Sequence, residues 1–211
     1  DHVLFSSGTT GNFKKLRYDG EVTERCMADP LSGPTARLIR REDVYHASSF
    51  GPWTKAGYIH PLICWLRGAT VVFDQRPDWI THFFDQPISA AMLMPPTMEQ
   101  LVRNTSALPA GHPRMRLFTG GGFIGADLVR RVIRKFRCEF YVMYGSTEMR
   151  IALESLVKSE DDVVWLRPNL DADVDICDEH GRSLDCGEEG ALRIRFSPNY
   201  PTEYMDDPEA T

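Results

Sequence analysis

The sequence predicts an α/β fold in which a mostly parallel sheet is covered by helices and followed by a small antiparallel β subdomain. Over residues 1–165, short apolar runs alternate with helix-period segments, which is typical of a parallel sheet with helical crossovers. In residues 166–211, period-two alternation of apolar and charged residues replaces that pattern, as in antiparallel strands with one solvated face. We therefore expect two subdomains that meet near residue 165.

The α/β part consists of short apolar runs and amphipathic stretches. Its predicted strands are residues 2–5, 69–73, 88–94, 115–119 and 139–143. Its predicted helices are residues 53–66, 78–85, 96–103 and 125–137. The last of these places Val132 and Phe136 on one face and Arg130 and Arg134 on the other. Residues 53–66 are apolar nearly all round, which predicts a helix buried on all sides.

Antiparallel pairing is predicted beyond residue 165. Val174 and Ile176 alternate with aspartates, and Leu192 and Ile194 alternate with arginines. The segment 178–181 between these runs contains glycine and acidic residues, as turns do.

Composition excludes several classes of protein. The 211 residues are 42% hydrophobic and carry 24 basic and 30 acidic side chains, with no basic run, so neither nucleic acid nor an anionic membrane is an expected partner. No apolar stretch reaches membrane-spanning length, and the histidines lack zinc-ligand spacing. Five cysteines without CxxC spacing favour a reducing cytoplasm. Both ends of the sequence suggest an internal piece of a longer chain.

Three predicted strands lead into loops suited to binding a nucleotide. These loops are Ser6-Ser7-Gly8-Thr9-Thr10-Gly11-Asn12-Phe13-Lys14-Lys15, Gly120-Gly121-Gly122-Phe123 and Tyr144-Gly145-Ser146-Thr147-Glu148. In an open α/β sheet, ligands bind outside the carboxyl ends of the strands, so we expect the three loops to line one crevice.

The first loop combines hydroxyls, glycines and Lys14. Hydroxyls and exposed N–H groups donate to phosphate oxygens, and glycines let the backbone approach an anion. Phe13 stands where a Walker A loop has its second glycine, so the loop is of another kind. Taken alone, it is equally well interpreted as a flexible surface loop.

The other two loops suit the base, the phosphates and a metal. Three successive glycines leave room for a flat ring against the main chain, although a tight turn is the alternative. Tyr144 can stack on a base, Thr147 can donate to phosphate, and Glu148 can bind Mg²⁺. The alternative for Thr147 and Glu148 is an ordinary helix start.

These motifs, in this order, resemble those of the adenylate-forming superfamily, which includes acyl-CoA synthetases, luciferases and nonribosomal-peptide adenylation domains. The stretches that carry the resemblance are SSGTTGNFKK, GGGF, YGSTE, GEEGALRIR and YMDDPEAT. The resemblance spans Asp1 to Thr211.

The resemblance implies roles for individual residues. The residues implied to bind the β- and γ-phosphates of ATP are Ser6, Ser7, Gly8, Thr9, Thr10, Gly11 and Lys14. Adenine is implied to lie between Gly122, Phe123 and Tyr144. Thr147 is implied to contact phosphate, and Glu148 is implied to bind Mg²⁺. The acyl pocket is walled by Ser49, Phe50, Gly51, Gly121 and Gly145, together with the helix after Gly51. Lys14, Thr147 and Glu148 are the catalytic candidates.

The implied reaction is attack of a substrate carboxylate on the α-phosphate of ATP, with loss of pyrophosphate, followed by thioester formation with CoA or a phosphopantetheine thiol. The implied partners are a small carboxylic acid and a C-terminal lid domain that this chain lacks. The family's ribose-binding aspartate and catalytic lysine are also absent, so the chain alone is expected to be inactive. Phe13, Lys15 and Ser48 depart from the family's usual proline, glycine and histidine, and we interpret the nearby His46 as structural.

Substrate class is indicated by Gly51. Amino-acid-activating members of the superfamily carry an aspartate there, and an unpaired buried ammonium is costly. The sequence therefore favours an acyl- or aryl-CoA ligase. An acid-activating domain that loads a carrier protein and a non-catalytic nucleotide-binding module are the alternatives.

Overall fold

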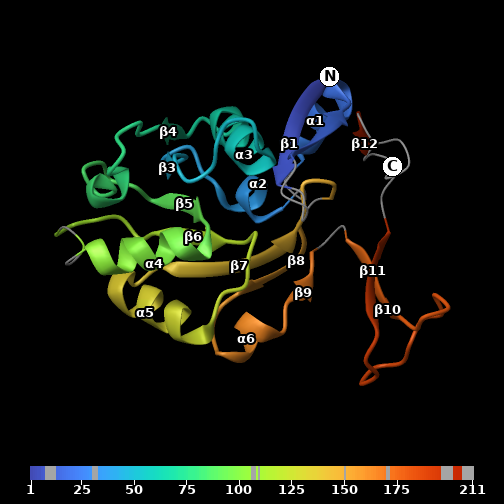
Figure 1. Cartoon of the computed structure of the whole chain (residues 1–211). Coiled ribbons are helices and arrows are strands. Elements are labelled where there is room, and N and C mark those ends of the chain that lie inside the picture. The colour runs from blue at the N-terminus through green and yellow to red at the C-terminus, as the bar shows by residue number, and fades with distance from the viewer. Residues whose placement is uncertain are drawn as a thin grey trace.

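The described strands of the chain form three sheets (Figure 1). The computed structural model describes residues 1–7, 13–29, 33–105, 108, 110–149, 151–169, 172–195 and 202–205. No helix within these ranges is long and apolar enough to span a membrane.

The central sheet has seven described strands in the order β4-β3-β5-β6-β7-β8-β9. They are β3 (Val44–His46), β4 (Thr70–Val72), β5 (Ala90–Leu93), β6 (Arg116–Thr119), β7 (Glu139–Gly145), β8 (Ile151–Leu156) and β9 (Arg167–Pro168). The first five strands of this order pair in parallel, whereas β8 and β9 pair antiparallel. The predicted fold class is confirmed.

Alternating side chains of the parallel strands feed two hydrophobic cores. On β5, Ala91 and Leu93 enter one core, while Ala90 and Met92 enter the other. Successive strand residues point to opposite faces, so a strand buried on both sides becomes a continuous apolar run. This is why the predictions for residues 88–94, 115–119 and 139–143 hold.

Helices cover both faces of the central sheet (Figure 1). The described helices are α1 (Gly20–Ala28), α2 (Pro34–Leu38), α3 (Lys55–Leu66), η2 (Trp79–His82), α4 (Pro95–Asn104), α5 (Ala126–Phe136) and α6 (Asp161–Val164). The core beneath α4 and α5 contains Met98 and Val132, and the core on the opposite face, against α3, contains Cys64.

Two helix predictions need correction. Helix α3 is not buried on all sides, because Trp65 is 54% exposed and Leu66 is 61% exposed. Residues 78–85 form only the single 3₁₀ turn η2, and Trp79 and Ile80 of this turn pack on the core that also contains Met98 of α4.

The prediction that residues 2–5 join the parallel sheet is wrong. Strand β1 (His2–Ser7) pairs antiparallel with β2 (Phe13–Tyr18), and β2 also pairs antiparallel with β12 (Thr202–Tyr204). These strands form a sheet of their own. Only five residues separate β1 from β2, which is too few for a parallel crossover, so the two strands pair antiparallel as the arms of a hairpin. β3 supplies a parallel strand to the central sheet that the sequence did not reveal.

The predicted antiparallel pair after residue 165 is present. Strands β10 (Asp173–Cys177) and β11 (Ala191–Arg195) pair with Val174 opposite Ile194. They form a separate two-stranded sheet that extends from the body of the molecule (Figure 1). The domain boundary near residue 165 stays a prediction.

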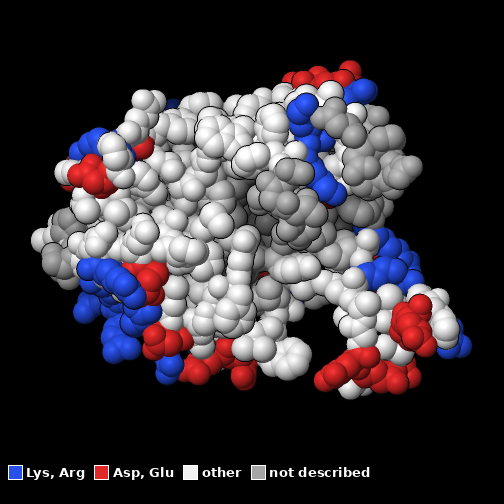
Figure 2. Space-filling model, viewed as in Figure 1, with Lys and Arg blue, Asp and Glu red and all other residues white. Residues whose placement is uncertain are grey.

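Charged side chains lie at the periphery of the face shown in Figure 2, around a largely uncharged centre. On α5, basic and acidic groups neutralise one another, since Arg131 contacts Glu99 at 2.5 Å and Asp127 at 3.0 Å. This face therefore presents mixed charge.

Candidate nucleotide and acid site

The glycine loop and the Tyr144 loop leave neighbouring strands at the same edge of the central sheet. β6 and β7 are parallel partners, with Thr119 opposite Val142. Gly120 lies so near β7 that an added Cβ would stand 2.9 Å from the Met143 carbonyl oxygen, and Gly121 has φ +77°. Both positions therefore require glycine. The pairing of β6 with β7 brings these two predicted loops together, as expected.

The rings proposed to bracket a base are accessible. Phe123 is 92% exposed and Tyr144 is 47% exposed. An aromatic face that receives a base must be open to solvent in the absence of the ligand.

The ends of the predicted phosphate loop are held by the β1–β2 hairpin. Ser6 lies opposite Lys14, and Ser7 lies opposite Phe13. The intervening Gly8, Thr9, Thr10 and Gly11 lie outside the described residues.

Lys14 and Glu148 approach the same tyrosine. The Lys14 ammonium lies 4.6 Å from the centre of the Tyr204 ring, and the Tyr204 hydroxyl donates to Glu148 Oε1 at 2.7 Å. Burial alone would raise the pKa of Glu148, but hydrogen bonds from Ser146 and Tyr204 outweigh it, so the pKa lies below its usual value. The carboxylate is therefore ionised at neutral pH, as a metal ligand must be.

Thr147 and Glu148 lie on a turn between two strands. β7 reverses into the antiparallel strand β8, so the alternative of a helix start is excluded. The Thr147 carbonyl oxygen accepts a hydrogen bond from the Tyr18 hydroxyl and another, at 3.3 Å, from the Lys55 ammonium. Lys55 also donates to the Met149 carbonyl oxygen at 2.5 Å.

The contacts of Tyr18, Lys55 and Tyr204 were missed from the sequence. Each joins segments that are more than 50 residues apart along the chain. A local signal existed only for Lys55, since a cation in the first turn of a helix opposes the helix dipole.

The predicted acid-binding wall is rigidly joined to α3. The Thr54 amide and hydroxyl both donate to the Gly51 carbonyl oxygen, at 2.9 and 2.8 Å. A Cβ added at Gly57 would lie 2.1 Å from that oxygen, and one added at Gly51 would lie 2.4 Å from the Trp53 ring. Phe50 packs against the core on this face of the sheet.

A main-chain hydrogen bond connects this wall to the hairpin. The Phe5 amide, near the end of β1, donates to the Trp53 carbonyl oxygen at 2.8 Å. The predicted phosphate loop and the predicted acid wall are therefore neighbours, although Phe5 and Trp53 are more than 40 residues apart along the chain.

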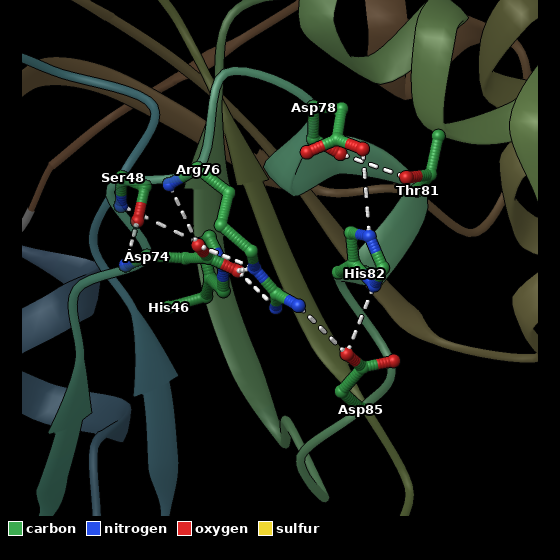
Figure 3. Close-up of polar contacts among 8 residues, drawn as sticks. All are labelled: His46, Ser48, Asp74, Arg76, Asp78, Thr81, His82 and Asp85. Atoms are coloured by element: carbon green, nitrogen blue, oxygen red, sulfur yellow. Dashed lines mark hydrogen bonds and ion pairs between the residues drawn. The ribbon is translucent and has the colours of Figure 1, made fainter.

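His46 is buried in the protein interior, which agrees with the structural role expected from the sequence. Its ring centre is 4.8 Å from that of Trp79 and 4.6 Å from that of Phe83. Burial lowers the pKa of His46 to about 4. The Ser48 amide donates to His46 Nδ1 at 3.5 Å, and the Asp74 amide donates to Ser48 Oγ at 2.7 Å (Figure 3).

Arg76 connects the segment after β4 to the residues that follow η2. Its guanidinium contacts both carboxylate oxygens of Asp74 and, at 3.2 Å, Asp85 (Figure 3). The hydrogen bonds that Arg76 donates to Asp74 lower the pKa of that carboxyl to about 2. The loop that leads to Ser49 is thereby anchored through Ser48 to a charged cluster at the sheet edge.

The sequence model of the AMP-binding enzyme family matches residues 2–204 of the chain. Among curated proteins, the mitochondrial acyl-coenzyme A synthetases ACSM4 of Rattus norvegicus and ACSM3 of Homo sapiens are each 26% identical over 99% of the chain. The chain spans only 37% of the length of either relative.

Two solved structures share the fold. ATP-bound MatB from Rhodopseudomonas palustris has a TM-score of 0.76 at 18% identity, covering 99% of this chain and 42% of that one. The O-succinylbenzoate coenzyme A synthetase MenE from Bacillus subtilis, in complex with ATP and magnesium ion, has a TM-score of 0.74 at 18% identity, covering 99% and 44%.

Proposed function

Because this chain belongs to the AMP-binding enzyme family, we propose that the protein carrying it is an ATP-dependent acid–thiol ligase. A substrate carboxylate oxygen forms a bond to the α-phosphorus of ATP, and the bond to the bridging oxygen breaks as pyrophosphate leaves. A thiolate, from CoA in the leading form of the proposal, then displaces AMP from the acyl carbon.

The observation that carries this proposal is the placement of Glu148. An ionised carboxylate lies on a turn beside the glycine loop and, through Tyr204, is connected to the lysine of the predicted phosphate loop. Catalysis of phosphoryl chemistry rests mainly on positioning and on neutralising charge, and this turn gathers groups for both.

Magnesium fits this donor set. Mg²⁺ binds through one or two carboxylates together with phosphate oxygens and water, and Glu148 supplies a carboxylate of low pKa. Among the described residues no group of three or more potential ligands gathers, which suits an ion held partly by a nucleotide. When bound, the ion would neutralise negative charge on the phosphates.

Side chains of this chain would bind the phosphates, the base and the acid. Lys14 and the hydroxyls of Ser6 and Ser7 would attract the phosphates. Phe123 and Tyr144 would hold the base against the glycine loop, leaving the acid to approach from Phe50 and Gly51.

The proposed acid is aryl or aliphatic. Gly51 carries no carboxylate to pair with a substrate ammonium, and Phe50 belongs to an apolar cluster. The two relatives are named acyl-coenzyme A synthetases, which agrees with this class.

Pyrophosphate exchange in the complete protein, with a panel of carboxylic acids, tests the function. Glu148→Gln keeps the shape of the side chain but removes its charge, so we expect exchange to fall on the order of 100-fold. Glu179→Gln, on the exposed turn between β10 and β11, is the matched control and is expected to be neutral.

Absence of exchange with every acid would refute the proposed function. The 211-residue chain belongs in the same assay. It is expected to show negligible turnover, because the resemblance places the ribose aspartate and the lid lysine outside it. Rapid exchange by this chain alone would contradict that expectation.

A further inference from the structure

We propose that Lys55 is a positioning residue that holds the turn Ser146–Met149, and with it the carboxylate of Glu148, in place. This inference rests on the proposed function, since it assigns Lys55 a role in the same site. Four observations carry it.

The first is the location of Lys55 at the start of α3. Thr54 caps this helix, its side chain accepting from the Gly57 amide, and the first turn contains no acidic residue. A cation there faces the positive end of the helix dipole, so the position is locally unfavourable. A residue that is unfavourable in its local element is usually stabilised by contacts with other parts of the fold.

The second observation is the set of groups that the Lys55 ammonium contacts. It donates to the carbonyl oxygens of Met149, at 2.5 Å, and Thr147, at 3.3 Å, and lies 5.6 Å from the centre of the Tyr18 ring. An ammonium has three donors and no acceptor, so it can bind two carbonyl groups at once. The two carbonyls belong to the residues on either side of Glu148.

The third is Tyr18, which supplies another donor from β2. Its hydroxyl donates to the Thr147 carbonyl oxygen. Burial, followed by the nearby Glu148 and Tyr204, raises the pKa of Tyr18, so the hydroxyl keeps its proton. The main chain before Glu148 is therefore held from two elements.

The fourth is the rigid base from which Lys55 reaches. Thr54 is bound twice to Gly51, and Gly57 packs directly on the Gly51 carbonyl oxygen. The side chain of Lys55 thus joins the proposed acid-binding wall to the proposed metal ligand. Displacing either end would displace the other.

The test uses three variants of the complete protein. Lys55→Met removes the charge and the donors, and Lys55→Arg retains both. Lys135→Met is the matched control, because Lys135 also donates to a main-chain oxygen, that of Val102 at 2.7 Å, but on α5. Two readouts are measured: amide hydrogen exchange at residues 146–149, and Mn²⁺ affinity by electron paramagnetic resonance with a non-hydrolysable ATP analogue.

We expect Lys55→Met to accelerate exchange in the turn about 10-fold and to weaken Mn²⁺ binding about 10-fold, as loss of a group that orients a metal ligand does. Lys55→Arg should recover most of both effects, and Lys135→Met should match the unmodified protein. If Lys55→Met does not fold, Lys55→Gln, which removes the charge but keeps a polar side chain, provides the comparison.

Unchanged exchange in the turn of the Lys55→Met variant would overturn the inference. So would unchanged Mn²⁺ affinity in a protein that binds the metal. If instead the unmodified protein binds no Mn²⁺ with the nucleotide, while exchange in the turn responds to Lys55→Met, the proposed function fails and the holding role of Lys55 stands.

Discussion

At the scale of single residues, the imidazole of His46 shows how burial sets a pKa. Two aromatic rings enclose it, and its side chain is 1% exposed. The protonated form loses its hydration there, and this outweighs the attraction of Asp74. The folded protein therefore binds this proton less readily than the unfolded chain does.

This difference predicts a pH dependence of stability. The pKa of His46 falls from 6.5 to about 4 on folding, so its contribution is fully present above pH 6.5 and is lost as pH falls toward 4. The loss amounts to about 3 kcal/mol over that interval. Urea unfolding of His46→Phe between pH 7 and pH 4 should show a correspondingly shallower decline.

The control for this experiment is His180→Phe, because the His180 side chain is 66% exposed. Its pH dependence should follow that of the unmodified chain. An equally steep decline in His46→Phe would show that other groups cause the loss.

At this scale, the residues that can be predicted from the sequence are those whose chemistry is visible in the local pattern. Gly120 and Gly121 indicate a close approach between main-chain segments, and Glu148 follows the end of a predicted strand. Tyr18, Lys55 and Tyr204 act through contacts with residues 56 to 129 positions away, and no local pattern encodes such contacts. The departure of Lys55 from the helix-dipole rule was the one sign available.

At the scale of elements, α5 ends on a strained residue. Its C-cap, Arg137, has φ 48°, and it is the one non-glycine residue with positive φ among those described. This left-handed conformation costs an L-residue about 1 kcal/mol or more, and glycine adopts it freely.

Arg137→Gly should therefore stabilise the chain by about 0.5–1 kcal/mol, measured by urea denaturation. The opposite sign is expected within the same helix: Arg134→Gly should destabilise it by roughly 1 kcal/mol, because glycine is unfavourable in a helix interior. Destabilisation by both substitutions would refute the cap argument.

Elements with strong periodicity were predicted well. The amphipathic stretch 125–137 contains α5, Ala126–Phe136, since a consistent apolar face specifies a helix. The strand β3 is three residues long and includes His46, so its pattern was too short to recognise. Residues 2–5 were recognised as a strand but assigned to the wrong sheet, because an apolar run does not specify its neighbour.

At the scale of the whole molecule, stability is unevenly distributed. β5, β6 and β7 lie between two cores, and Leu93, Leu117 and Phe140 are fully buried. Among the described strands, β10 and β11 pair only with each other, and Ile176 and Leu192 are each 37% exposed. An isolated two-stranded sheet is marginally stable.

Amide hydrogen exchange should reveal this difference. Amides of β10 and β11 are expected to exchange on the order of 100-fold faster than those of β5 to β7, because they open without unfolding the cores. Mass spectrometry of peptides covering 173–177 and 90–93 provides the comparison. Equal protection would mean that the two-stranded sheet and the central sheet unfold as one unit.

The pairing of β12 with β2 also governs when the site can assemble during synthesis. Tyr204, which bonds to Glu148 and lies beside Lys14, is made 56 residues after that glutamate. At the usual 5–20 residues per second, this delay lasts about 3–11 s. A nascent chain that already exposes the hairpin and the Glu148 turn must therefore wait for its last described strand to leave the ribosome.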